Sequence, residues 1–327
     1  MKKTTFIWID DDSHREKDSN NMARALNIKV IFEDVRKKIM EKKIKQILSR
    51  PQPDLVLIDH RLNNVSRGGI IKTGSTTAEI IREKWSDCPI VCITAVKLKD
   101  INLHRQLIYE QVIEYSQLSE NYPSLISLAK SFKSLRRKRL KDSNDFIELI
   151  KAPQADRVRL SAVLPEELKR NFKDKSLIIS ISRWIRNTLM AKPGFLYDRL
   201  WIATTLGIKE HSFEKIEEIF KGAMYKGIFA DKGNQRWWKT KLQGVLYSTF
   251  TSSEGQFTWM LGRKLSRIKK QDYSVCYVCK KEFPEIVGFT DETAQTRKPM
   301  HLRCSVSHPV FEKALFFEEI RMMKAAE

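Results

Sequence analysis

Residues 6–12 read FIWIDDD, four apolar residues followed at once by three aspartates. Two further stretches have the same build, DLVLIDHRL at 54–62 and PIVCITA at 89–95, where a short apolar run ends on a polar residue. Two more apolar runs lie at 28–32 and 112–115. Runs of this length, bounded by polar residues, are typical of strands buried on both faces. The sequence therefore predicts five strands.

Between these runs, apolar residues recur at helical spacing, as in 35–48 and 78–85. Alternating strands and helices predict a doubly wound α/β fold, in which helices cover both faces of a parallel sheet. The functional crevice of such a sheet lies beyond the carboxyl ends of its strands.

Carboxylates stand at those ends. The first run leads into Asp10 and Asp11, and the third ends on Asp59. Like charges forced together at one edge are unfavourable unless a cation neutralises them. Because hard cations prefer oxygen ligands, Mg²⁺ is the expected occupant. The alternative for the aspartates of the first run is a solvated turn.

These motifs resemble the receiver domain of bacterial response regulators, and the resemblance covers residues 4–130. It implies that Asp59 accepts a phosphoryl group and that Thr94 bonds the phosphoryl oxygen. It further implies a magnesium site made by Asp10, Asp11 and the backbone carbonyl of Arg61. A histidine kinase or another protein is then an expected partner, and dimers are possible in this family.

The sequence departs from the receiver pattern in two places. Receivers carry a lysine on the fifth strand, about three residues past an aromatic, and counting from Tyr115 reaches Leu118 instead. The loop after the acceptor is also longer and basic, at 63–73. Lys97 and Lys99 are candidates to replace the missing ammonium. Phosphorylation and metal-dependent docking without phosphorylation therefore both stay open.

Charge is distributed unevenly along the 327 residues, whose net charge is +20. Residues 131–270 carry 30 Lys and Arg against 14 Asp and Glu, a net charge of +16. A basic segment of this size indicates a polyanionic partner, and nucleic acid is the usual one. The alternative is a solvated, lysine-rich surface.

The sequence predicts four parts, a receiver-like domain at 1–128, a helical connector at 129–150, a basic, mainly helical domain at 151–270 and a metal-binding module at 271–327. Trp184 and Trp201 are expected in the core of the third part. Adjacent tryptophans at 237–238 are not expected to face one interior together, which favours an exposed ring. The candidate contacts to nucleic acid are Arg136, Arg137, Lys138, Arg139, Arg236, Trp238, Lys239 and Lys241.

The last part has a metal-ligand pattern. Cys276 and Cys279 are separated by two residues, and so are His301 and Cys304, 21 residues further on. Four nitrogen and sulfur ligands fill the tetrahedral shell of zinc, so a structural zinc site is expected. A redox pair of the first two cysteines is the alternative. Over 273–325 the pattern resembles a treble-clef zinc finger followed by a helix, and His308 is a spare ligand candidate.

The other cysteines, Cys88 and Cys92, are predicted to be small buried hydrophobes. No apolar run approaches the roughly 18 residues of a membrane span, and no signal-peptide core follows Met1, so a cytoplasmic protein is expected. No catalytic residue set is found. The first hypothesis is a regulator whose receiver-like domain controls a zinc-containing output that binds nucleic acid. The others are a non-catalytic adaptor for protein partners and, third, a metal-dependent nuclease.

Overall fold

The computed structural model describes residues 3–37, 40–62, 73–138, 140–170, 174, 177–192, 194–250, 256–282, 289–291, 299–301, 304 and 314–315. The chain forms two compact units. The first consists of Met1–Phe146 and Leu164–Arg183, the second of Ile147–Val163 and Trp184–Glu327. The domain boundaries at 128, 150 and 270 stay predictions.

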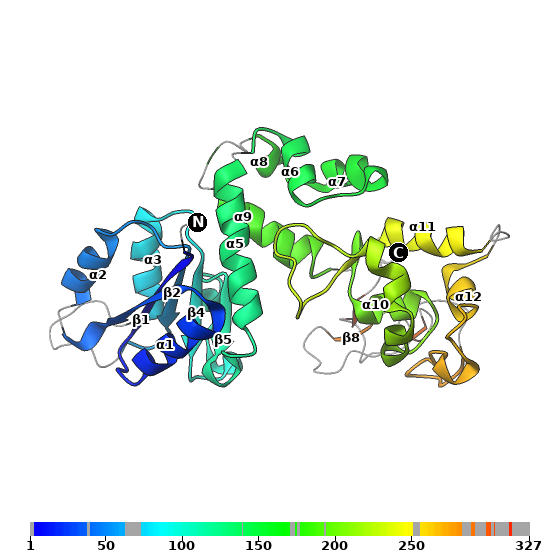
Figure 1. Ribbon diagram of the computed structural model, residues 1–327, viewed down its shortest axis with the longest axis horizontal. Helices are drawn as coiled ribbons and strands as arrows, with labels where there is room; N and C mark the ends of the chain where they lie inside the picture. The colour runs from blue at the N-terminus through cyan, green and yellow to red at the C-terminus, as the bar shows by residue number, and fades with distance from the viewer. Residues whose placement is uncertain are drawn as a thin grey trace. The chain divides into compact units, whose positions relative to one another are not determined.

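The first unit alternates strands with helices, as predicted (Figure 1). Its strands are β1 Thr5–Asp10, β2 Lys29–Asp34, β3 Leu55–Asp59, β4 Ile90–Thr94 and β5 Gln111–Glu114. Its helices are α1 Arg15–Leu26, α2 Met40–Leu48, α3 Gly74–Lys84, α4 Leu103–Gln106, α5 Tyr122–Lys138 and α8 Glu166–Arg170, with α9 Leu177–Trp184 and α6 Ser143–Leu149 at its edges.

All five strands are parallel, in the order β2-β1-β3-β4-β5. This is the doubly wound order whose direction of winding reverses between β1 and β3, and ligands bind at that reversal. Ile9 of β1 pairs with Ile58 of β3, so the next residues, Asp10 and Asp59, lie side by side where the reversal opens.

Alternation along the strands builds one core on each face of this sheet. Helices α2 and α3 pack against each other over one face, and α1 packs against α5. The first core combines strand residues with residues of α2 and α3: Ile7, Ile9, Val56, Ile58, Ile90, Cys92, Ile44, Ile47, Ala78 and Ile81. Cys88 and Cys92 are fully buried, as predicted, and burial raises the pKa of both thiols.

The second unit is mainly helical and contains a two-stranded antiparallel ribbon, β6 Leu196–Tyr197 with β7 Trp237–Trp238. Its helices are α7 Arg157–Val163, α10 Arg199–Thr205, α11 Lys239–Thr249 and α12 Thr258–Arg263, with a π-helix at Ile185–Leu189 and 3-10 helices at Gln154–Asp156, Glu210–Lys215, Glu217–Ala223 and Lys270–Asp272. A second ribbon pairs β8 Phe289–Asp291 with β9 Ala314–Leu315. A strand therefore stands where the spacing around Leu315 predicts a helix.

The expectation that one of the paired tryptophans is exposed is wrong. Trp237 is 0% exposed and its ring meets Phe213 edge-on, with centroids 5.5 Å apart. Trp238 is 1% exposed and meets Tyr225 at 5.7 Å. Successive residues of a strand point to opposite faces, and both faces of β7 are covered. Trp201 is in the core as expected, at 1% exposed, and Trp184 is half-buried.

Within the described parts of the chain, no helix has the length and apolar character that a membrane crossing requires.

Candidate metal centres

An acidic cluster lies at the carboxyl ends of β1 and β3. Asp10 and Asp11 are buried and Asp59 is half-buried, and one carboxylate oxygen from each lies within 4.8 Å of the others. Asp10 is held in place by two donors, the Trp8 indole Nε1 at 3.1 Å and the Asp12 amide at 2.9 Å. The structure thus brings together the three aspartates that the sequence singled out.

Without a counter-ion, Asp10 and Asp59 resist ionisation. Burial raises the pKa of Asp10 to about 6. Burial, and then the charges of Asp10 and Asp11, raise the pKa of Asp59 to about 7. A divalent cation removes both causes because it replaces the lost hydration and opposes the negative charge. Three oxygen donors at this spacing fit Mg²⁺.

The start of α3 packs closely against the backbone of Asp59. A Cβ on Gly74 would lie 2.1 Å from the Asp59 carbonyl oxygen, so only glycine fits there. The Arg61 amide donates to the Asp59 carboxylate at 3.2 Å. This bond directs one Asp59 oxygen toward the loop whose carbonyl is the predicted further ligand. Residues 63–72 of the predicted insert at 63–73 lie outside the described residues.

Thr94 ends β4 and is 1% exposed. Its hydroxyl oxygen accepts a hydrogen bond from the Val96 amide at 3.0 Å, which leaves its own hydrogen available to donate. Asp59 pairs with Ile93, the residue before Thr94. Thr94 is therefore one position beyond Asp59 along the adjacent strand, and its bond to a phosphoryl oxygen stays a prediction.

The end of β5 carries a carboxylate, Glu114, paired with Thr94. The count of three residues from Tyr115, meant to find the lysine position of the fifth strand, reaches Leu118, which lies beyond the strand. Tyr115–Gln117 form a 3-10 turn after the strand end, and Leu118 is buried. The strand itself, Gln111–Glu114, contains no lysine. The Glu114 carboxylate accepts a bond from the Leu98 amide at 3.0 Å, which holds the loop after β4.

Two arginines stand near the acidic cluster, and each already has an acidic partner. Arg36 binds Asp34 through two nitrogens, at 3.1 and 2.9 Å. Arg15 lies 3.7 Å from Asp12, and its guanidinium lies 3.3 Å from the centroid of the Tyr115 ring. Lys97 and Lys99 are exposed, and no described hydrogen bond or ion pair joins either to the three aspartates.

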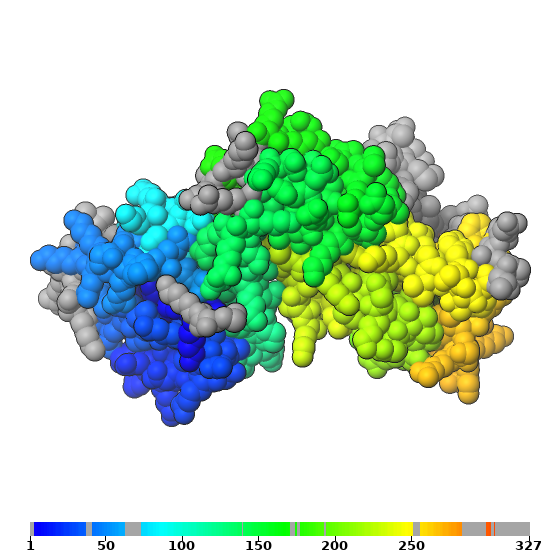
Figure 2. Space-filling view, turned by 45° about the horizontal axis from the view of Figure 1, so that its top comes forward, coloured from blue at the N-terminus to red at the C-terminus, as the bar shows by residue number. Residues whose placement is uncertain are grey.

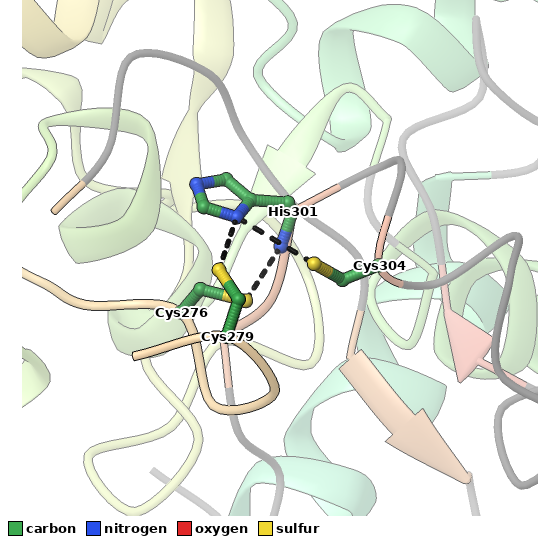
Figure 3. Close-up of side chains that lie close together, drawn as sticks. All are labelled: Cys276, Cys279, His301 and Cys304. Atoms are coloured by element: carbon green, nitrogen blue, oxygen red, sulfur yellow. Dashed lines mark hydrogen bonds between the residues drawn. The ribbon is translucent and has the colours of Figure 1, made fainter. Parts of the chain in front are cut away.

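The second cluster contains Cys276, Cys279, His301 and Cys304, whose ligand atoms lie within 4.8 Å of one another (Figure 3). His301 Nδ1 is 3.1 Å from the Cys279 sulfur and 3.7 Å from that of Cys304. The His301 amide donates to the Cys276 sulfur at 3.3 Å. Tetrahedral zinc with Zn–S bonds of about 2.3 Å sets sulfurs about 3.8 Å apart, which this set fits.

The first two ligands lie on a tight turn, residues 276–281, which we call the knuckle. The Cys276 amide donates to the Lys281 carbonyl and the Lys280 amide to the Cys276 carbonyl, both at 3.0 Å. Lys280 has φ of 60°, the left-handed conformation that reverses the chain here. The Tyr277 amide donates to the Pro299 carbonyl at 2.8 Å and so joins the knuckle to the second ligand pair. His308 and the predicted terminal helix, apart from Ala314–Leu315, lie outside the described residues.

The predicted nucleic-acid contacts are divided between the two units. In the first unit, Arg136 lies 3.6 Å from Asp54, Lys138 donates to the Asp145 carbonyl at 3.4 Å, and Arg137 is exposed. Arg139 lies outside the described residues.

In the second unit, Arg236 Nε donates to the Met190 carbonyl at 2.7 Å. Lys239 is half-buried with its ammonium 6.0 Å from the Tyr197 ring, and Lys241 is exposed on α11. Trp238 is buried, so its ring is closed to bases.

No family model matches the chain, and no curated protein sequence matches it. Among solved structures it is similar to the N-terminal domain of a response regulator/sensory box/GGDEF three-domain protein from Carboxydothermus hydrogenoformans (17% identity, 40% of this chain and 98% of that chain, TM-score 0.32). A response regulator from Thermotoga maritima, in complex with Mg²⁺ and BeF, matches at 17% identity (37% and 98%, TM-score 0.30). A two-component response regulator from Clostridium difficile matches at 23% identity (41% and 98%, TM-score 0.30). The N-terminal unit has a receiver-like fold, shown by its strand order and by the acidic cluster at the switch point of its sheet.

Proposed function

We propose that the chain is a response-regulator-like protein, in which the receiver-like unit binds Mg²⁺ and accepts a phosphoryl group on Asp59 to control a zinc-containing unit that binds nucleic acid. The observation that carries the proposal is the convergence of Asp10, Asp11 and Asp59 within 4.8 Å at the switch point of the sheet. Asp10, Asp11, Asp59 and the Arg61 carbonyl are the ligands for Mg²⁺, which supplies positive charge to the carboxylates and to phosphoryl oxygens.

The transfer needs Asp59 ionised. One Asp59 oxygen attacks the phosphorus of the donor, the bond from phosphorus to the leaving atom breaks, and the leaving group departs with the electron pair. The product is an acyl phosphate on Asp59. Thr94 donates its hydroxyl hydrogen to a phosphoryl oxygen, because this hydrogen stays available while the hydroxyl oxygen accepts the bond from the Val96 amide.

Acetyl phosphate with Mg²⁺ is expected to label the wild-type chain, and Asp59→Asn is expected to lose the label. Phos-tag electrophoresis or intact mass spectrometry measures the added phosphoryl group. Asp12→Asn is the matched control, because Asp12 lies at the same edge, is 42% exposed, and is outside the ligand set. A label that persists in Asp59→Asn means that another residue is the acceptor.

A second candidate function, an adaptor that docks partners without phosphorylation, is favoured by Glu114. A phosphoryl group on Asp59 adds negative charge at an edge that already holds Glu114 where receivers carry a cation. In this alternative, binding of Mg²⁺ without phosphorylation sets the charge of the acidic edge to which partners dock. Glu114→Lys separates the two. If the Glu114 carboxylate limits phosphorylation, Glu114→Lys should raise the extent of labelling several-fold. If the chain is an adaptor, neither the wild type nor Glu114→Lys should be labelled.

Nucleic-acid binding by the second unit is supported by its residues 147–163 and 184–270, which carry 19 Lys and Arg against 9 Asp and Glu, a net charge of +10, and by exposed cations such as Lys241. Binding that neutralises phosphates releases counterions, so the affinity should fall linearly on a log–log salt plot by about 0.9 per phosphate contact. A mobility-shift titration against duplex and single-stranded DNA at several salt concentrations measures the slope. Lys241→Ala should reduce it by about 0.9.

Lys221→Ala is the control for that variant, since Lys221 is exposed on the same unit but pairs with Glu218 at 2.8 Å. It removes the same charge from a position outside the candidate set. A chain that binds neither form of DNA at low salt contradicts this part of the proposal and leaves the receiver-like unit unaffected.

A further inference from the structure

The knuckle displays an aromatic ring. Tyr277 is 39% exposed, whereas Tyr197, Trp201 and Trp237 of the same unit are 1% exposed or less. A large aromatic side chain gains most of its stabilisation from burial. The position of Tyr277, between two metal ligands, instead leaves part of its ring in contact with solvent.

The backbone beneath this ring is fixed on both sides. The Tyr277 amide is bonded to Pro299, and the turn is closed by the bonds between Cys276 and residues 280 and 281. A metal held by Cys276 and Cys279 would add one coordination bond on each side of Tyr277 along the chain. The ring is therefore presented on a rigid base, which lowers the entropy cost of using it as a contact surface.

One cation lies against the ring, and further lysines lie on the knuckle and on the segment that leads into it. The Lys280 ammonium lies 4.5 Å from the Tyr277 ring centroid, and Lys281 is exposed. At the foot of the knuckle, Lys269 and Lys270 are exposed, and Lys209 donates to the Gln271 carbonyl at 2.9 Å. The segment 256–282 that carries most of these groups lies at the surface of the second unit, in orange (Figure 2).

Two acids lie close to the knuckle along the chain, Asp272 and Glu282, and they do not cancel this charge. Asp272 is buried, and its carboxylate already accepts bonds from Ser212 and Lys215, at 2.9 and 2.5 Å. These bonds hold the pKa of Asp272 down at about 2, so it stays an ionised, internally satisfied group. Glu282 is exposed, and the lysines around the knuckle outnumber it.

We propose that Tyr277 is a stacking platform for a base of single-stranded nucleic acid, with Lys280 and Lys281 on the phosphates beside that base. The inference rests on the proposed nucleic-acid function and names its site and ligand class. Aromatic rings with adjacent cations bind single strands because every base has a face to stack. In a duplex those faces are covered by neighbouring base pairs, so an exposed ring favours the single strand.

Fluorescence anisotropy with a labelled oligothymidylate tests the platform. Tyr277→Ala should weaken binding by about tenfold or more, the effect expected for losing one base stack, and Tyr277→Phe should bind like wild type. Tyr247→Ala is the matched control, because Tyr247 on α11 is also 39% exposed. The zinc content of each variant is measured alongside.

A second arm needs no variant. An abasic oligonucleotide of the same length offers the phosphates without the bases, so the wild-type chain should bind it about tenfold more weakly. Equal affinity of the wild-type chain for the intact and the abasic oligonucleotide overturns the stacking platform. Equal losses of affinity in Tyr277→Ala and Tyr247→Ala also overturn it, and neither result contradicts nucleic-acid binding itself. Preference for duplex DNA over the single strand also overturns the platform. A wild-type chain that binds no nucleic acid at low salt removes the proposed output function itself.

Discussion

Asp59→Asn will make the N-terminal unit more stable at pH 8 in the absence of divalent cations, by about 2–4 kcal/mol in the free energy of unfolding. The reason is the position of Asp59 among two other carboxylates in a buried edge. Its pKa rises from 3.8 to about 7 on folding, because burial and the charges of Asp10 and Asp11 disfavour the ionised form. An amide of the same shape avoids both costs.

The pH dependence follows from the direction of that shift. A carboxyl group whose pKa is higher in the folded state binds more protons when folded, so the unit loses stability as pH rises from about 4 to about 7. Asp10, with a pKa of about 6, adds to the loss over the lower part of that range. Wild type should therefore weaken between pH 4 and 7, and Asp59→Asn should weaken less.

Hydrogen exchange of peptides that span β1 and β3 measures this stability for the N-terminal unit alone. Mg²⁺ should restore protection in the wild type at pH 8 and restore much less in Asp59→Asn. Asp12→Asn, at an exposed carboxylate on the same edge, should change protection little. Equal protection in the wild type and Asp59→Asn at pH 8 would mean that the three carboxylates do not oppose one another, and the magnesium site would lose its basis.

The acidic cluster could be predicted because it depends on periodicity and topology alone. Apolar runs ending on Asp10 and Asp59 predicted strand ends, and parallel strands bring such ends to one edge. Which residue of β5 pairs with Thr94 follows from neither the periodicity nor the strand order. Glu114, which pairs with Thr94, was missed because the lysine position was sought by counting residues from Tyr115. That count runs into the 3-10 turn at Tyr115–Gln117, which follows the strand end. The strand register with β4 decides which residue stands there.

The paired tryptophans show a different limit. A rule about alternation correctly predicts that Trp237 and Trp238 point to opposite faces, but solvent on one face was an added assumption. Residues distant in sequence, Phe213 on one side and Tyr225 on the other, cover the two faces. A two-residue strand has no periodic pattern from which burial on both faces could be predicted, because its burial comes from elements packed around it. The candidate stacking ring then shifts to Tyr277, whose exposure no periodicity predicts.

Cys279→Ser will remove bound zinc from the chain and open the segment around the knuckle. The wild-type chain should carry about one zinc per molecule, because four ligands fill the tetrahedral shell and leave no open position. Zinc binding in small structural sites contributes about 10–16 kcal/mol, more than a short segment gains from packing. In the metal-free cluster, burial and then the neighbouring cysteines hold the pKa of Cys304 up at about 11, so zinc binding must release the proton of this thiol.

Elemental analysis of the purified chain counts the zinc, and limited trypsin digestion reports the opening, since Lys280 and Lys281 are exposed sites on the turn. Cleavage there should be slow in the wild type and fast in Cys279→Ser or after chelation. Cys88→Ala is the control, because Cys88 is fully buried in the other unit and belongs to no ligand set. A native chain without metal, or a Cys279→Ser chain that keeps it, would show that the four residues converge for another reason. The knuckle would then lack the anchors that make Tyr277 a rigid platform, so the zinc count also bears on where a single strand binds.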